Sequence, residues 1–143
     1  MMVQFMRGAV RLAALIFAVS VFPVAAQAKS QKIDCENATA TSELNWCADQ
    51  EFEAADKDLN KAYAEALKSI PEMAGEPPYD AKAWEAALRA SQRAWIAYRD
   101  AECNDHVPMF WTGGSGATAE IVGCKSAMTK ARTKEIQEHY TEH

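Results

Sequence analysis

Residues 41–70 read TSELNWCADQEFEAADKDLNKAYAEALKSI, and apolar side chains recur along this stretch at steps of three or four residues. This spacing is typical of a helix that buries one face. Thr41 and Ser42 are favourable N-cap residues, and Pro71 is expected to end the helix because proline interrupts its hydrogen bonding. The predicted buried face comprises Leu44, Ala48, Phe52, Ala55, Leu59, Ala62, Tyr63, Ala66 and Ile70.

A second helix is expected after residues 75–78, GEPP, which favour a turn. It should begin after Asp80, a favourable N-cap, and end near Asn104, before Pro108. Because the connection is short, the two helices should pack antiparallel. The same spacing predicts an inner face made of Trp84, Leu88, Ser91, Trp95, Tyr98 and Glu102, widened by Ala87, Ala94 and Ala101.

A third helix is expected to follow a loop at His106–Gly116 and to begin at Ser115 or Thr118. The sequence shows no strand-like alternation of apolar and polar residues. We therefore predict an all-α fold, a small three-helix bundle that combines an antiparallel hairpin with a third helix and holds two disulfides. The predicted apolar stripe of the third helix is Ala117, Ile121, Cys124, Met128 and Ala131, continued by Ile136 and Tyr140.

Residues 1–28 have the features of a secretory signal peptide: arginines near the start, an apolar run at 12–22, and small residues before a cleavage site after Ala28. The apolar run is too short to span a bilayer. Cys35 follows Gln-Lys-Ile-Asp, which is not the context of a lipid-anchored cysteine. We therefore expect residues 29–143 to form one domain, free of the membrane after signal cleavage, in the periplasm or outside the cell.

The four cysteines, Cys35, Cys47, Cys103 and Cys124, all follow the predicted signal peptide. An exported chain with an even number of cysteines is expected to form disulfides. Cys35–Cys47 and Cys103–Cys124 would each close a short loop, whereas Cys47–Cys103 stays open as an alternative because the hairpin brings these two together. Cys103 and His106 have the spacing of a metal-ligand pair, but no second close pair accompanies them.

The charge of the chain excludes some classes of protein. Lysine and arginine total 15 and aspartate and glutamate 20, so the net charge is −5 and no basic nucleic-acid-binding protein is expected. The apolar fraction of 49% excludes a disordered chain. Without residues 1–28, 13 basic and 20 acidic residues remain, a net charge of −7. This balance favours a basic protein partner, because complementary charge speeds encounter.

No group of residues indicates catalysis. The run 113–116, GGSG, lacks the second glycine of a hydrolase nucleophile elbow, and no strand precedes it. Asp56 and Asp58 are two residues apart on a predicted helix and therefore point in different directions. The histidines are not paired with a serine or thiol nucleophile. We predict no enzyme, no catalytic residue, no cofactor and no metal.

The tryptophans and one arginine have predicted structural roles. Trp84 and Trp95 lie on the predicted inner face, whereas Trp46 is offset from the first helix's stripe and is expected to be partly exposed. Trp111, in the predicted loop, either folds over the bundle, which is favoured, or is presented to a partner. Arg99 follows Trp95 by four residues, so it could lie over the indole ring or pair with an acid of the first helix. We expect it to act as an interhelical polar clamp rather than to bind a ligand.

The runs 55–63, ADKDLNKAY, and 91–103, SQRAWIAYRDAEC, together with the four cysteines, resemble the LprI-like family of bacterial envelope proteins, named for a mycobacterial lysozyme inhibitor. The resemblance extends from Asp34 to about Gln137. It implies a small secreted helical domain with disulfides that binds and inhibits lysozyme. The positions of the family motif are Gln92, Arg93, Trp95, Tyr98, Arg99, Asp100, Gly113, Gly114 and Ser115.

Two hypotheses of function follow. In the first, the protein binds a basic lysozyme-like hydrolase through an acidic face of the first helix and through the Met109–Gly116 loop. The candidate contacts are Glu51, Glu53, Asp56, Asp58 and Trp111. In the second, the protein is an accessory or structural domain of the envelope that binds another protein and does not inhibit lysozyme.

Overall fold

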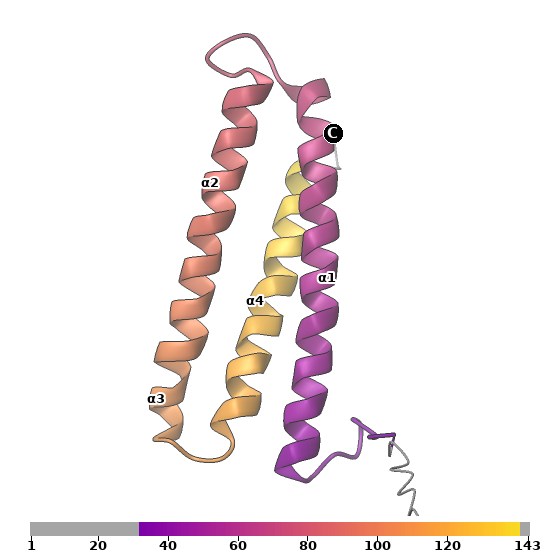
Figure 1. Ribbon diagram of the computed structural model, residues 1–143, viewed down its shortest axis with the longest axis vertical. Coiled ribbons are helices and arrows are strands. Elements are labelled where there is room, and N and C mark those ends of the chain that lie inside the picture. The colour runs from indigo at the N-terminus through magenta and orange to yellow at the C-terminus, as the bar shows by residue number, and fades with distance from the viewer. Residues whose placement is uncertain (1–31, 141–143) are drawn as a thin grey trace, which may run out of the picture. The chain divides into compact units, whose positions relative to one another are not determined.

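The computed structural model describes residues 32–140, which are helical with short connections and contain no strand (Figure 1). This confirms the all-α prediction, whereas the predicted signal peptide at residues 1–28 lies outside the described part. The elements are α1 (Thr41–Met73), α2 (Ala81–Asp100), the π-helical stretch η1 (Ala101–His106), α3 (Val107–Trp111) and α4 (Ala117–Tyr140).

The core forms mainly where α1 and α4 lie side by side, running in the same direction, while α2 runs in the opposite direction (Figure 1). α1 presents small side chains at Ala55, Ala62 and Ala66, all buried, and α4 presents the buried Ser126 and Thr129. Small residues on both helices allow a close approach of the two backbones. Larger buried side chains complete the core at Leu59, Ile70, Leu88 and Ile136.

The first helix differs from its predicted ends by a few residues. The N-cap is Ala40, whose backbone N–H donates to the Glu43 carboxylate at 3.4 Å. Pro71 lies inside α1, which continues to Met73. Proline removes the backbone donor that would bond the carbonyl four residues earlier, and α1 ends two residues after it. At α2 the predicted N-cap is confirmed, because the Asp80 carboxylate accepts the Ala83 N–H at 2.8 Å.

The predicted loop at His106–Gly116 is wrong for its first half, because helical structure continues through η1 and α3 to Trp111. Pro108 lies in the first turn of α3, directly after the π-helical stretch η1, so the continuous helix lacks one backbone donor at this position. The chain then turns at Thr112 and Gly113, both in the left-handed region with φ of 46° and 79°.

The inner faces of α2 and α4 are more polar than the apolar spacing predicted. On α2 the buried residues are Leu88, Gln92 and Arg99, whereas Tyr98 is 60% exposed. On α4 the buried residues are Ser126, Thr129, Arg132, Thr133 and Ile136; of these, only Ile136 belongs to the predicted apolar stripe. These polar groups are tolerated because most are hydrogen-bonded; the Thr133 hydroxyl, for example, donates to the carbonyl of Thr129 at 2.9 Å.

Candidate protein-binding site

Two disulfides lie at one end of the bundle, the lower end in Figure 1. Cys35 pairs with Cys47 and Cys103 with Cys124, with Cα–Cα distances of 5.7 and 5.6 Å. These are the two pairs expected from short loops, and the alternative pair Cys47–Cys103 does not form. The first bond ties the entering chain to α1, and the second ties η1 to α4. We call residues 32–50 and 101–124 the disulfide end.

Arg99, in the family-motif run, is an interhelical clamp. Its guanidinium carbon lies 5.4 Å from the centre of the Phe52 ring on α1 and 5.2 Å from that of Trp95. It also donates to Oγ1 of Thr129 on α4, at 3.3 Å, and to the Asp100 carboxylate, at 2.9 Å. The stacking on Trp95 agrees with the sequence-based expectation, whereas the acidic partner is on α2 itself and not on α1.

Gln92, also in the motif, belongs to a second polar layer between α2 and α4. Arg132 of α4, 7% exposed, donates from Nε to the Gln92 side chain at 3.1 Å and from a terminal nitrogen to Ser91 at 2.9 Å. Its other terminal nitrogen donates to Glu135 at 2.7 Å. Since every one of these contacts is internal to the bundle, this part of the motif stabilises the packing of α2.

The remaining motif residues lie on the surface or in the turn before α4. Arg93, Tyr98 and Ser115 are exposed. Gly113 has a positive φ, and the N–H of Gly114 donates to the carbonyl of Trp111 at 2.8 Å. The glycine-rich run is therefore a turn.

Gly116 lies against the face of Trp111, and a Cβ at this position would overlap the indole ring. The substitution Gly116→Ala should displace the ring and lower the free energy of unfolding by about 1 kcal/mol, the usual cost of an added methyl group without space. Urea unfolding with tryptophan fluorescence would measure both effects. The control is Gly123→Ala in α4, where a Cβ meets nothing within 4 Å; this change should stabilise by about 1 kcal/mol. Equal effects of the two substitutions would contradict the packing of Trp111.

The four predicted acidic contacts on α1 do not share one face. Glu51 and Asp58 are seven residues apart and lie on one side, while Glu53 and Asp56 project elsewhere. Glu51 pairs with Lys130 of α4, and Asp56 accepts from Asn60 at 2.9 Å. Within residues 32–140, α3 contacts η1 and α4 but not α1, so the structure separates Trp111 from these carboxylates.

Instead, the structure presents an apolar tip on α3, formed by Met109, Phe110 and Trp111. These side chains are 69%, 74% and 41% exposed. His106 supports the tip, because its ring lies 5.0 Å from that of Phe110 and its Nδ1 is 3.0 Å from the Glu102 carboxylate. Large apolar side chains so exposed and adjacent are a feature of protein-binding surfaces. In the sequence, this tip is indicated by the run of three large apolar residues directly after Pro108.

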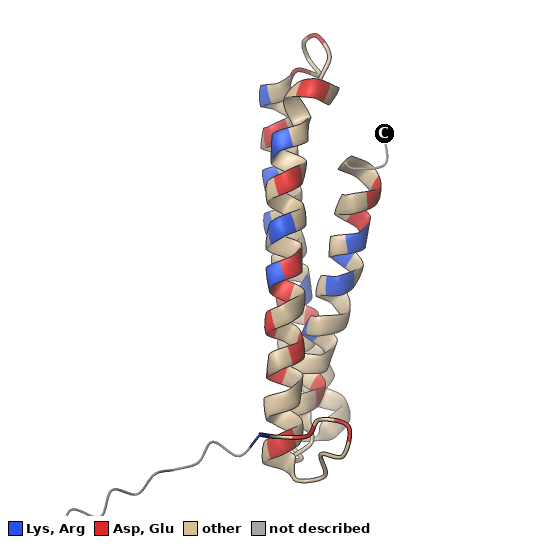
Figure 2. Ribbon diagram, turned by 90° about the vertical axis from the view of Figure 1, so that its right-hand side faces the viewer, with Lys and Arg blue, Asp and Glu red and all other residues tan. Residues whose placement is uncertain are grey.

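Carboxylates dominate the charge of the disulfide end. Acidic residues gather along the lower half of the bundle, while lysines and arginines are more frequent above (Figure 2). Hydrogen bonds from the Asn37 side chain and from the Glu36 backbone lower the pKa of Asp34 below its ordinary value. The acidic residues here are Asp34, Glu36, Glu43, Asp49, Glu102, Asp105 and Glu120, against Lys32.

Over residues 32–140, no three His, Cys, Asp or Glu side chains are grouped as a metal site would require. The same residues include no helix with the length and apolar character needed to cross a membrane. The disulfide end carries an exposed apolar tip beside carboxylates and two disulfide bonds.

Comparison with known proteins agrees with this structure. A family model described as "Lysozyme inhibitor LprI" matches residues 35–136. The uncharacterized protein R02472 of Rhizobium meliloti (strain 1021) is 35% identical over 116 residues, which cover 79% of this chain and 83% of that protein. The uncharacterized protein YecT of Escherichia coli (strain K12) is 31% identical over 106 residues, covering 69% of this chain and 64% of that protein. No solved structure matches.

Proposed function

Because the chain belongs to the LprI family, we propose that it is an exported protein that binds and inhibits a basic cell-wall hydrolase of the lysozyme type. Disulfides persist in the oxidising compartments outside the cytoplasm, and both pairs of cysteines are bonded here. The proposal therefore places the protein in the periplasm or outside the cell, where such hydrolases act.

The exposed apolar tip on α3 carries the proposal. Phe110 and Met109 are exposed on a short helix that directly follows η1, and one disulfide ties η1 to α4, so little backbone freedom is lost when a partner covers them. We propose that these apolar side chains enter a concave site such as the substrate cleft of a hydrolase. Large rigid side chains in the centre of an interface commonly supply most of its binding energy.

Charge supports the choice of a basic partner. Glu102 and Asp105, on η1, directly precede the tip, and the surrounding disulfide end is acidic. Carboxylates around an apolar centre would meet lysines and arginines around the partner's cleft. This arrangement predicts fast association at low ionic strength and weaker association as salt screens the charges.

The direct test is to add the purified protein, without residues 1–28, to lysozyme and follow lysis of cell-wall material at low and moderate salt. We expect inhibition at micromolar concentrations that weakens as salt rises. No inhibition at a micromolar excess in either condition would overturn the proposal, and the accessory-domain hypothesis would then be pursued by capture of a native partner.

Phe110→Ala should weaken inhibition at least about tenfold, as expected when a central aromatic contact of an interface is lost. Its melting temperature should stay unchanged because the Phe110 side chain is 74% exposed. The matched control is Ile96→Ala, which removes an exposed apolar side chain from α2, away from the disulfide end. Undiminished inhibition by Phe110→Ala would show that the tip is not the contact.

A further inference from the structure

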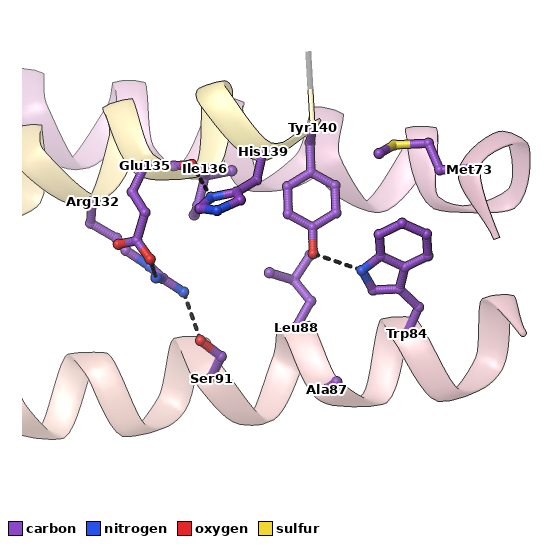
Figure 3. Close-up of a pocket in the computed structure, with 10 residues that line it drawn as sticks. All are labelled: Met73, Trp84, Ala87, Leu88, Ser91, Arg132, Glu135, Ile136, His139 and Tyr140. Carbon is purple, nitrogen blue, oxygen red and sulfur yellow. Dashed lines mark hydrogen bonds and ion pairs between the residues drawn. The ribbon is translucent and has the colours of Figure 1, made fainter. Parts of the chain in front are cut away.

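A cavity of about 440 Å³ lies between α2 and α4, far from the disulfide end, with Met73 of α1 at its margin (Figure 3). Its size is within the range of small-molecule sites, which occur between the helices of bundles. Leu88 and Ile136, both buried, form its apolar floor. The cavity exists because the α2 residues that face α4 here, Ala87 and Ser91, are too small to fill the space.

Aromatic side chains form one wall of the cavity. The Trp84 Nε1–H donates to the Tyr140 hydroxyl at 3.1 Å, and the two ring centres are 6.1 Å apart, so this bond fixes the indole (Figure 3). Trp84 also lines a second cavity, of about 400 Å³, which adjoins the first and is bordered by Pro78 and Tyr79. The Tyr79 side chain is 77% exposed. Two neighbouring cavities thus share one oriented tryptophan.

Polar side chains form the opposite side of the first cavity, where Ser91, Arg132, Glu135 and His139 gather (Figure 3). Arg132 is buried and paired with Glu135, so the two charges of the lining cancel. A fatty acid would require an unpaired cation for its carboxylate, and an organic cation would require an unpaired carboxylate. The lining instead offers hydroxyl, carboxylate, imidazole and guanidinium groups that together donate and accept hydrogen bonds.

We propose that the two cavities bind a neutral oligosaccharide, with consecutive sugar rings on either side of Trp84. A sugar ring has a face of C–H groups, which packs on an aromatic ring, and an edge of hydroxyls, which both donate and accept hydrogen bonds. The aromatic wall matches the first feature, and the polar side, where the charges of Arg132 and Glu135 are paired, matches the second. This site is independent of the tip on α3, so each proposal can fail without the other.

The test is a titration of the ¹⁵N-labelled protein, followed through the assigned indole N–H signals of its tryptophans. The probes are the tetramers of N-acetylglucosamine and of glucose, which distinguish an amide-bearing sugar from a plain hexose. With either probe we expect the Trp84 signal to move while those of Trp46 and Trp111, at the disulfide end, do not. Decanoate and choline are titrated in parallel, as a charged lipid and an organic cation.

Tyr79→Ala should weaken binding about fivefold, equivalent to about 1 kcal/mol for one aromatic contact. The Tyr79→Ala variant should fold normally because the Tyr79 side chain is exposed. The control is Tyr98→Ala, which removes another exposed tyrosine, on α2, and should bind the saccharides like the unaltered protein. The proposal is overturned if neither tetramer moves the Trp84 signal at about 10 mM, where a site with a Kd of about 1 mM would be nine-tenths full. Binding of decanoate or choline without either saccharide would also overturn it.

Discussion

Replacement of both Cys103 and Cys124 by alanine is expected to lower the free energy of unfolding by about 3 kcal/mol, the stabilisation given by a crosslink of this span in the chain-entropy model. The bond joins residues 21 apart and ties η1 to α4. It also closes the end of α2, which contributes fewer buried residues to the core than α1 does. Loss of this bond therefore removes the covalent link between η1 and α4.

Urea unfolding of the double variant, compared with a Cys35→Ala, Cys47→Ala variant, would measure this effect. The Cys35–Cys47 bond spans 12 residues and holds a segment whose residues 34–37 are exposed. Because that segment gains freedom in the folded state as well, its release should cost less than about 1 kcal/mol. Equal losses in the two variants would show that the second bond has no special part in holding α2. The Cys103/Cys124 variant should also inhibit lysozyme less well, because it loosens the base of the tip.

The second large effect is expected from Arg99→Ala, which should destabilise by about 3 kcal/mol, a value typical of breaking a buried charged contact. The substitution removes stacking on Phe52 and Trp95 and the hydrogen bond to Thr129, so all three long helices lose a contact. It also leaves a space where a side chain that is nine-tenths buried has been removed.

Thermal unfolding of Arg99→Ala and of Arg93→Ala would isolate the role of the clamp. Arg93 is exposed and lies on the same helix, so its loss should change stability by less than about 0.5 kcal/mol. Arg99→Lys should restore only part of the stability, because an ammonium group lacks the planar surface that stacks on two rings. A loss from Arg99→Ala as small as that from Arg93→Ala would refute the clamp.

The two proposed surfaces lie at opposite ends of the bundle and make separate predictions. Loss of Phe110 should affect inhibition, whereas loss of Tyr79 should affect saccharide binding. A protein that binds a saccharide at the cavities and a hydrolase at the tip could bind both at once, because the two surfaces are separate. Each measurement has its own control at an exposed side chain of α2, Ile96 for the first and Tyr98 for the second.

Much of the fold could be predicted because local rules decide it. The spacing of Ala55, Leu59 and Ala62 indicated the buried side of α1, and Asp80 marked the start of α2. The short loops closed by the cysteines indicated their pairing. The site was less predictable. Apolar spacing predicted that Tyr98 is buried and did not predict that Gln92 is. The role of a buried amide is visible only from its hydrogen-bond partner, which for Gln92 is Arg132, forty residues away.

The sequence by itself determined the helical class, the turns and the acidic balance, because helix periodicity, capping and net charge depend on residues near one another or on composition alone. Tertiary structure decided which polar residues are buried, how far helical structure continues past Pro108, and that the acids of α1 lie apart from Trp111. The physical reason is that burying a long polar side chain is costly unless hydrogen-bond partners satisfy it, and for these side chains some partners come from another helix. The three-dimensional packing alone supplies those partners, as it does for Arg99 and Arg132.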